Sequence, residues 1–217
     1  MRKIILASGS SRRKQILEWA ELPFDVLVQD TDETFEDGLS PESAAIQIAV
    51  NKAVGVQQLI KAHQSSPEVF PMGNQDLINI LIAIHEANEG IPPILSADTM
   101  VVINNKIIGK PADKNEATEM LMELSGTKHL VITGVCILYN EQEIVFADTT
   151  EVEFHDITLQ QINFYVDKYQ PYDKAGAYAI QEWIGVVGIK SVKGDFYNVM
   201  GLPVSRVIQH LNKLLLR

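Results

Sequence analysis

Residues 5 to 17, ILASGSSRRKQIL, combine hydroxyl, small and basic residues at the point where an apolar strand would lead into a helix. Such a turn leaves the first backbone N–H groups of the helix free to bind an anion. Ser8 and Ser10 add hydroxyl donors, and Arg12 and Arg13 can offer forked donors to phosphate oxygens. The pattern predicts a phosphate site, and its alternative is a capped surface helix with a solvated basic turn.

Carboxylates and lysines at four other places could take part in the same chemistry. Asp98 and Thr99 lie near the end of an apolar strand in SADTMV, where a carboxylate can act as a general base or a Mg²⁺ ligand. Glu33 belongs to an acidic loop, Lys52 to a largely uncharged helical stretch, and Lys110 to the turn GKP. Taken alone, each of these residues could equally be a solvated surface or strand-end group.

Two segments nearer the C-terminus could approach a planar ligand. The segment DKAGAYAIQ, residues 173–181, is rich in Gly and Ala, and Gln181 could read the edge of a base through its amide. The segment GDFYNVMGLP, residues 194–203, places Phe196 and Tyr197 ahead of the last helix. The alternative for both aromatic residues is a place in the core.

The elements that must position these residues alternate between strands and helices. The patterns predict strands at 3–7 and 24–28, a helix from Ser10 or Ser11 to about Ala20, and a helix over 40–62. They also predict a hairpin at Asn104-Asn105, two long strands over 129–140 and 143–157, helices over 113–126, 158–169 and 200–217, and a strand with a turn over 183–198. We therefore expect an α/β fold with a long twisted mixed sheet flanked by helices. We expect one domain over residues 1–217, with an inserted helical segment at about 64–93.

Composition excludes several classes of protein. A formal net charge of −10 argues against binding a nucleic acid polymer, and it makes a local basic cluster informative. The single cysteine forms no internal disulfide, as expected in a reducing cytoplasm, and no apolar run is long enough to span a membrane. The five histidines lack metal-ligand spacing, and the chain has neither a P-loop nor a G-x-S-x-G motif.

Four motifs in order resemble the Maf family of nucleoside triphosphate pyrophosphatases over nearly the whole chain. They are ILASGSSRRKQIL, ADTMVVINNKIIGKPADKNEATEMLMELSGTKHLVITGV, DKAGAYAIQ and GDFYNVMGLP. The resemblance implies attack of water on the α-phosphorus of a nucleoside triphosphate, with release of a monophosphate and pyrophosphate. It also implies a divalent cation, Mg²⁺ or Mn²⁺, two lobes with a cleft as in the inosine triphosphate pyrophosphatases, a homodimer, and a cytoplasmic location.

The resemblance also implies roles for individual residues. Asp98 would be the general base, and Asp98 and Glu33 would be the metal ligands. The triphosphate would contact Ser8, Ser10, Arg12, Arg13, Lys52 and Lys110, and substrate choice would depend on Arg12, Thr99 and Gln181.

DKAGAYAIQ together with GDFYNVMGLP resembles the branch of the family that acts on dTTP and UTP. The alternatives are a pyrophosphatase for 7-methyl-GTP or ITP, and a non-catalytic nucleotide-binding regulator of septum formation.

Two features depart from the family pattern: Ser11 stands where many relatives have Pro, and residues 64–93 lengthen the span between Lys52 and Asp98. The added helix is too apolar to lie free in water, so it should pack on the body or at a dimer interface. If it covered the cleft, it would change the substrate range.

Overall fold

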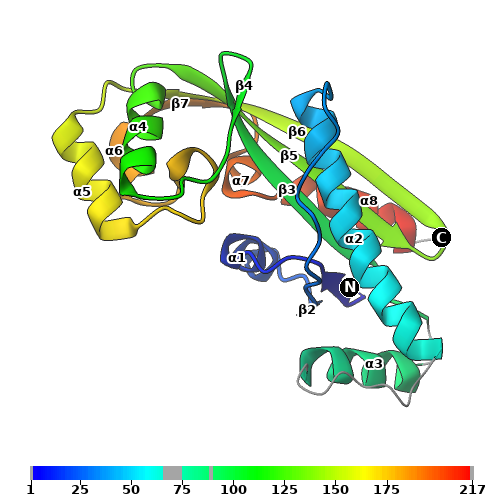
Figure 1. Cartoon of the computed structure of the whole chain (residues 1–217). Coiled ribbons are helices and arrows are strands. Elements are labelled where there is room, and N and C mark those ends of the chain that lie inside the picture. The colour runs from blue at the N-terminus through cyan, green and yellow to red at the C-terminus, as the bar shows by residue number, and fades with distance from the viewer. Residues whose placement is uncertain (1, 66–74, 88–89, 216–217) are drawn as a thin grey trace.

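The computed structural model describes residues 2–65, 75–87 and 90–215, and a mixed sheet runs through the middle of the described part (Figure 1). Its seven strands lie in the order β2-β1-β3-β5-β6-β7, with β4 paired to β3. β1 is parallel to β2 and β3, and the other pairs are antiparallel. The strands are β1 (Ile4–Leu6), β2 (Phe24–Val26), β3 (Ile94–Ile103), β4 (Lys106–Ile108), β5 (Lys128–Tyr139), β6 (Gln142–Phe154) and β7 (Ile189–Lys193).

Helices gather at both ends of the long strands β3, β5 and β6. The helices are α1 (Ser11–Trp19), α2 (Pro41–Ser65), α3 (Gln75–Ala87), α4 (Lys114–Leu124), α5 (Leu159–Tyr169), α6 (Trp183–Gly188), α7 (Phe196–Met200) and α8 (Val204–Leu215), with a 3-10 turn at Ala175–Ala177. Figure 1 shows α4, α5 and α6 at one end of the sheet, and α2 and α3 with β1 and β2 at the other. The predicted mixed α/β fold is confirmed.

Short sequence signals explain where several elements begin and turn. The Ser10 Oγ accepts a hydrogen bond from the Arg13 N–H (3.4 Å) and so caps α1. Pro41 begins α2 directly after Ser40. Asn104 and Asn105 have φ values of 51° and 61°, the left-handed conformation that a two-residue hairpin turn requires, and they join β3 to β4 as predicted.

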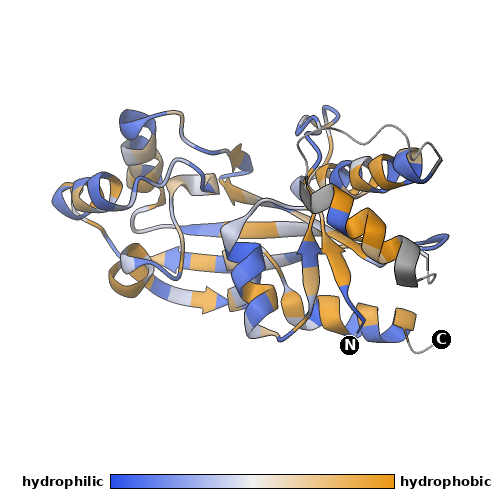
Figure 2. Cartoon of the chain, turned by 90° about the horizontal axis from the view of Figure 1, so that it is seen from below, coloured by the Kyte–Doolittle hydropathy of each residue, from blue (hydrophilic) through white to orange (hydrophobic). Residues whose placement is uncertain are grey.

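Neighbouring residues of β1 point to opposite faces of the sheet and enter different layers of the core. Ile4 and Leu6 pack in a cluster that includes residues of α1 and α8, whereas Ile5 and Ala7 pack with residues of α2 and α3. Figure 2 shows hydrophobic residues along the strands near the N-terminus. The sheet is thus covered on both faces at this end.

Helix α2 lies directly on the sheet. Gly134 of β5 makes this possible, because a Cβ atom there would lie 2.3 Å from the backbone of Ala45. Ala49 and Ala53 continue the same small-residue face and are fully buried. The helix therefore runs close to the strand backbone, which fixes where its polar residues emerge.

One predicted element was wrong in part. The strand with a turn expected over 183–198 spans only Ile189–Lys193, because residues 183–188 form helix α6 and residues from Phe196 onward form helix α7. Gly185 crosses so close to Ile180 that an added Cβ would lie 1.7 Å from the Ile180 carbonyl oxygen, and Trp183 packs edge-on against Phe164. The packing of Trp183 against Phe164 is a tertiary contact, and it outweighs the β propensity of the apolar run.

Helix α3 belongs to the predicted inserted segment, of which residues 66–74 and 88–89 lie outside the described ones. Its residues Ile80 and Ile84 are buried against a cluster that contains Ile5 and Ile94. Helix α3 therefore packs on the body of the protein, which was one of the two expected positions for it. That the segment is an insertion within a single domain stays a prediction. Among the described residues, no helix has the length and apolar character needed to cross a bilayer.

Candidate functional site

Strand β3 has a gap along one edge. β1 pairs there with Ile94 and Leu95, and β4 pairs with residues 101–103, so no described strand pairs with residues 96–100 on this edge. Asp98 and Thr99 lie in the gap and are the two partly exposed residues of an otherwise buried strand. A ligand at the gap can reach the turn after β1 and both faces of β3.

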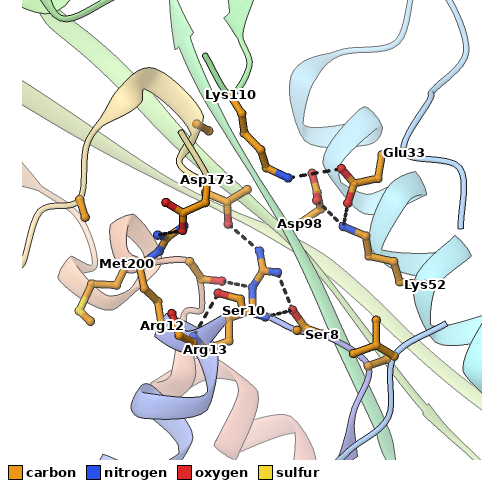
Figure 3. Close-up of a pocket in the computed structure, with 18 of the residues that line it drawn as sticks. Ser8, Ser10, Arg12, Arg13, Glu33, Lys52, Asp98, Lys110, Asp173 and Met200 are labelled. Carbon is orange, nitrogen blue, oxygen red and sulfur yellow. Dashed lines mark hydrogen bonds and ion pairs between the residues drawn. The ribbon is translucent and has the colours of Figure 1, made fainter. Parts of the chain in front are cut away.

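A pocket of about 580 Å³ opens at this gap (Figure 3). Its walls come from the turn after β1, the loop before α2, α2 itself, β3, the loop after β4, and residues around 173–179 and 199–201. It brings together every predicted site residue except Gln181, namely Ser8, Ser10, Arg12, Arg13, Glu33, Lys52, Asp98, Thr99 and Lys110. None of the described residues of α3 lines it.

Lys52 lies between two carboxylates at one end of the pocket. Its Nζ atom is 2.8 Å from Asp98 Oδ1 and 2.7 Å from Glu33 Oε1. Lys110 approaches the other oxygen of Glu33 at 3.6 Å. Figure 3 shows these four side chains converging from α2, β3 and two loops. The charges of two lysines and two carboxylates thus balance one another here.

The close contact between α2 and the sheet explains why Lys52 meets Asp98. Asp98 is directly opposite Gly134 in the register of β3 and β5, so both face α2. Lys52 follows Ala45, the residue that touches Gly134, by about two helical turns and so lies on the same side of the helix. The hydrogen bond from Lys52 holds the pKa of Glu33 below its usual range, and the charges of Lys52 and Lys110 add to this effect against the opposing effect of partial burial.

Arg13 is a buried cation with neutral partners. Only 8% of its surface is exposed. Its guanidinium donates from Nε to the Gly201 carbonyl (2.8 Å), from Nη1 to Ser8 Oγ (3.0 Å) and from Nη2 to Thr99 Oγ1 (3.1 Å). Burial lowers its pKa, and no carboxylate of the described chain lies within ion-pair distance of it. The charges of Asp98 and Glu33 offset this effect of burial only in part, so the buried cation favours an anionic ligand nearby.

The Thr99 hydroxyl donates its proton to Thr133 and not into the pocket. Thr133 Oγ1 donates to the Asn198 carbonyl (3.1 Å), so the contact between the Thr99 and Thr133 hydroxyls (3.0 Å) must use the proton of Thr99. Arg13 already donates to Thr99. Toward a ligand, Thr99 therefore presents an acceptor and no donor.

Arg12 and Arg13 separate within the site although they are adjacent in sequence. The Arg12 side chain is partly exposed, and its Nη1 lies 3.2 Å from Asp173 Oδ2.

Gln181, eight residues after Asp173, does not line the pocket. Its Oε1 atom is buried, with no hydrogen-bond partner among the described residues. The loop reaches the pocket instead through Asp173, Ala175, Tyr178 and Ala179.

Several lining residues had no role in the sequence prediction. They are Val28 to Thr31 before α2, Asp173, Tyr178, and Val199 to Gly201. The quoted segments 173–181 and 194–203 contained most of these positions, but only the fold shows which side chains face the cavity. Val28 was predicted only as the end of a strand, and residues 29–31 carried no signal for a binding site.

The residues that could hold a divalent cation are oxygen donors. Asp98 and Glu33 offer carboxylates, which suit Mg²⁺ or Mn²⁺, but both contact Lys52. Among the described residues, no group of three or more His, Cys, Asp or Glu side chains forms a metal cage. The set fits a cation that keeps most of its ligands from water and phosphate, as Mg²⁺ commonly does.

Known proteins resemble this chain over almost its whole length. The Maf-like protein family matches residues 3–214. A dTTP/UTP pyrophosphatase of Cytophaga hutchinsonii is 43% identical over 211 residues, which are 97% of this chain and 84% of the relative. Proteins with the same name from Bacillus cereus and Bacteroides fragilis are each 38% identical over 213 residues, which are 98% of this chain and 96% of each relative.

Proposed function

The chain belongs to the Maf-like protein family, and on that premise we propose that it hydrolyses dTTP and UTP to the nucleoside monophosphate and pyrophosphate. The observation that carries the proposal is the convergence of Asp98, Glu33, Lys52 and Lys110 at the gap in the sheet, beside the basic turn after β1. A triphosphate carries close to four negative charges, and hydrolysis depends mainly on placing and neutralising them.

Asp98 is the proposed general base. Lys52 occupies its Oδ1, while Oδ2 has no partner among the described residues and can accept a proton from water. The water oxygen forms a bond to the α-phosphorus as the bond to the bridging oxygen breaks, and pyrophosphate leaves. Lys52 and Lys110 stabilise the charge that develops on the phosphate oxygens. Arg12, with Ser8, Ser10 and Arg13, binds the remainder of the anion. Arg12 and Thr99 contribute to substrate choice from the pocket wall, and Gln181, which does not line the pocket, would act on it indirectly.

A divalent cation, Mg²⁺ or Mn²⁺, completes the proposed site. Asp98 and Glu33 would hold it through their carboxylate oxygens, jointly with phosphate oxygens. Its chemistry there is to neutralise the triphosphate and orient it. Lys52 contacts both carboxylates, so it must move or share them when the cation and substrate enter.

We further propose a homodimer located in the cytoplasm. The single cysteine, Cys136, is buried and unpaired, which suits a reducing compartment. Exposed apolar side chains such as Val186 (82% exposed) offer surface for a second copy. Light scattering on the purified protein and imaging of a tagged chain test these two points.

Pyrophosphate release from a nucleotide panel tests the activity. The panel contains dTTP, UTP, CTP, GTP, 7-methyl-GTP and ITP with Mg²⁺, and each is assayed with the natural chain and with Asp98→Asn. We expect release from dTTP and UTP, with a loss of about 100-fold or more in kcat for Asp98→Asn, because amide nitrogen and oxygen cannot take the proton.

The other results would change the proposal in different ways. Hydrolysis of a purine nucleotide, lost in Asp98→Asn, would keep the mechanism and overturn the substrate. Tight nucleotide binding without any pyrophosphate release would support the non-catalytic regulator instead.

A further inference from the structure

The ion pair between Arg12 and Asp173 is anchored from the buried side of the protein. Taken alone it is an exposed pair, since the Asp173 side chain is 65% exposed, and such pairs contribute little stability. The second oxygen of Asp173, however, accepts a hydrogen bond from Lys174 Nζ at 2.7 Å. The Lys174 side chain is only 9% exposed. One carboxylate therefore joins an exposed arginine to a buried lysine.

Lys174 is held in turn by a second carboxylate. Its Nζ lies 3.6 Å from Glu182 Oε1, and Glu182 Oε2 accepts a hydrogen bond from the Tyr165 hydroxyl. Tyr165 is fully buried in α5, and its hydroxyl also accepts from the Ala179 N–H (3.2 Å) in the pocket wall. A continuous polar chain thus runs from the core to Arg12.

Asp173 is ionised at neutral pH. Partial burial raises its pKa, but the hydrogen bond from Lys174 and the charges of Lys174 and Arg12 outweigh burial, so the pKa lies below its usual range. The same loop is also tied to the lysine end of the pocket, because the Gly176 N–H donates to the Gly109 carbonyl (3.0 Å) beside Lys110. Its position relative to both ends of the pocket is thereby set.

We propose that Asp173 is a positioning residue that sets nucleotide preference by holding the Arg12 guanidinium in place, and that Lys174 holds Asp173. The inference rests on the proposed function. Without Asp173, a flexible arginine beside a triphosphate turns toward the most negative group available. Held by Asp173, Arg12 keeps part of its donor set directed at the rest of the nucleotide. Preference among nucleotides then depends on Asp173, although Asp173 lies on a different segment from Arg12.

A binding cycle tests this link. Dissociation constants for dTTP, UTP and ITP are measured by calorimetry in EDTA for the natural chain, Asp173→Asn, Arg12→Gln and the double variant. Asp167→Asn is the matched control, because Asp167 is a similarly exposed aspartate (57%) paired with Lys114 away from the pocket. We expect Asp173→Asn to reduce the preference for dTTP over ITP about tenfold, with the melting temperature unchanged.

The double variant tests whether Asp173 acts through Arg12. If Asp173 acts through Arg12, Asp173→Asn causes no further loss of preference in the Arg12→Gln background. An unchanged preference in Asp173→Asn, an equal loss in Asp167→Asn, or additive losses in the double variant would each overturn the proposal. So would a natural chain that binds the three nucleotides equally.

The cycle and the activity assay fail separately. Binding is measured without turnover. A chain that binds dTTP selectively but releases no pyrophosphate would therefore overturn the proposed activity, and the binding cycle would still test the role of Asp173. A chain that hydrolyses dTTP while Asp173→Asn keeps its preference would overturn only the role of Asp173.

Discussion

At the scale of single residues, the site is organised by two cationic side chains, each of which contacts several groups. Lys52 contacts both Asp98 and Glu33, and Arg13 satisfies Ser8, Thr99 and the Gly201 carbonyl. Each shared contact fixes several groups with one charge, so apart from Lys52, which must share its two carboxylates, these groups are held in place before charge develops. Preorganised charge of this kind lowers a barrier because little has to move when charge develops.

His129 contacts a residue of the pocket wall and makes the protein sensitive to acid. It is 2% exposed, its Nε2 lies 2.7 Å from the Tyr178 hydroxyl, and Tyr178 lines the pocket. Burial lowers the pKa of His129 to about 4. Because the unfolded chain takes up a proton first as the pH falls below about 6.5, stability is lost between about pH 6.5 and 4.

We therefore expect the free energy of unfolding to fall by about 2 kcal/mol between about pH 7 and pH 5 through His129 alone. Urea unfolding at the two pH values measures this for the natural chain, His129→Gln and the exposed control His155→Gln. The pH effect should shrink in His129→Gln and persist in His155→Gln. An equal pH effect in all three proteins would refute the assignment to His129.

At the scale of elements, the site depends on how closely α2 approaches the sheet. A methyl group at position 134 would lie 2.3 Å from the Ala45 backbone, so Gly134→Ala must push α2 away from β5. Lys52 would then move away from Asp98. We expect a loss of about tenfold or more in kcat for dTTP, because displacements of about 1 Å are costly in preorganised sites, and a loss of about 1–3 kcal/mol in stability.

Val135→Ala separates these two effects. Val135 is buried on the opposite face of β5, so its truncation destabilises the same strand without displacing α2. Steady-state kinetics well below the melting temperature of both variants should show a loss of kcat only in Gly134→Ala. Equal kcat losses in the two variants would mean that lowered stability, and not the position of Lys52, limits activity.

Local signals predicted these elements better than they predicted the site. The cap at Ser10 and the turn at Asn104-Asn105 follow from backbone chemistry over a few residues, so sequence suffices for them. Helix α6 was missed because the packing of Trp183 against Phe164 is a tertiary contact. Asp98 could be nominated from its strand, but the gap beside it exists only because β1 and β4 pair with different parts of β3.

Long-range packing, which local sequence does not show, also explains why Arg12 and Arg13 have different partners. Nothing in the sequence distinguishes two adjacent arginines, yet α1 turns one toward Asp173 and buries the other against Gly201. Both partners lie more than 150 residues further along the chain. Side chains that meet through such long-range packing, including Lys174 and Glu182, become visible only when the sheet order is known.

At the scale of the whole molecule, an acidic protein is proposed to bind a polyanion. The net charge of −10 repels a triphosphate at long range, whereas Arg12, Lys52 and Lys110 attract it at contact distance. Salt affects these two terms unequally, because it screens exposed charges beyond a Debye length of about 8–10 Å and leaves partly buried contacts nearly intact. Long-range repulsion should therefore be the first term that salt removes.

We expect kcat/KM for dTTP to rise about two- to threefold as KCl increases from about 0.01 to 0.15 M at constant Mg²⁺, with kcat unchanged. Glu119→Gln/Glu123→Gln changes two exposed carboxylates of α4 outside the pocket and brings the net charge from −10 to −8. It should raise kcat/KM at low salt and flatten the salt dependence. A steady fall of kcat/KM from the lowest salt onward would show the opposite balance, in which the field of the pocket already dominates encounter at long range.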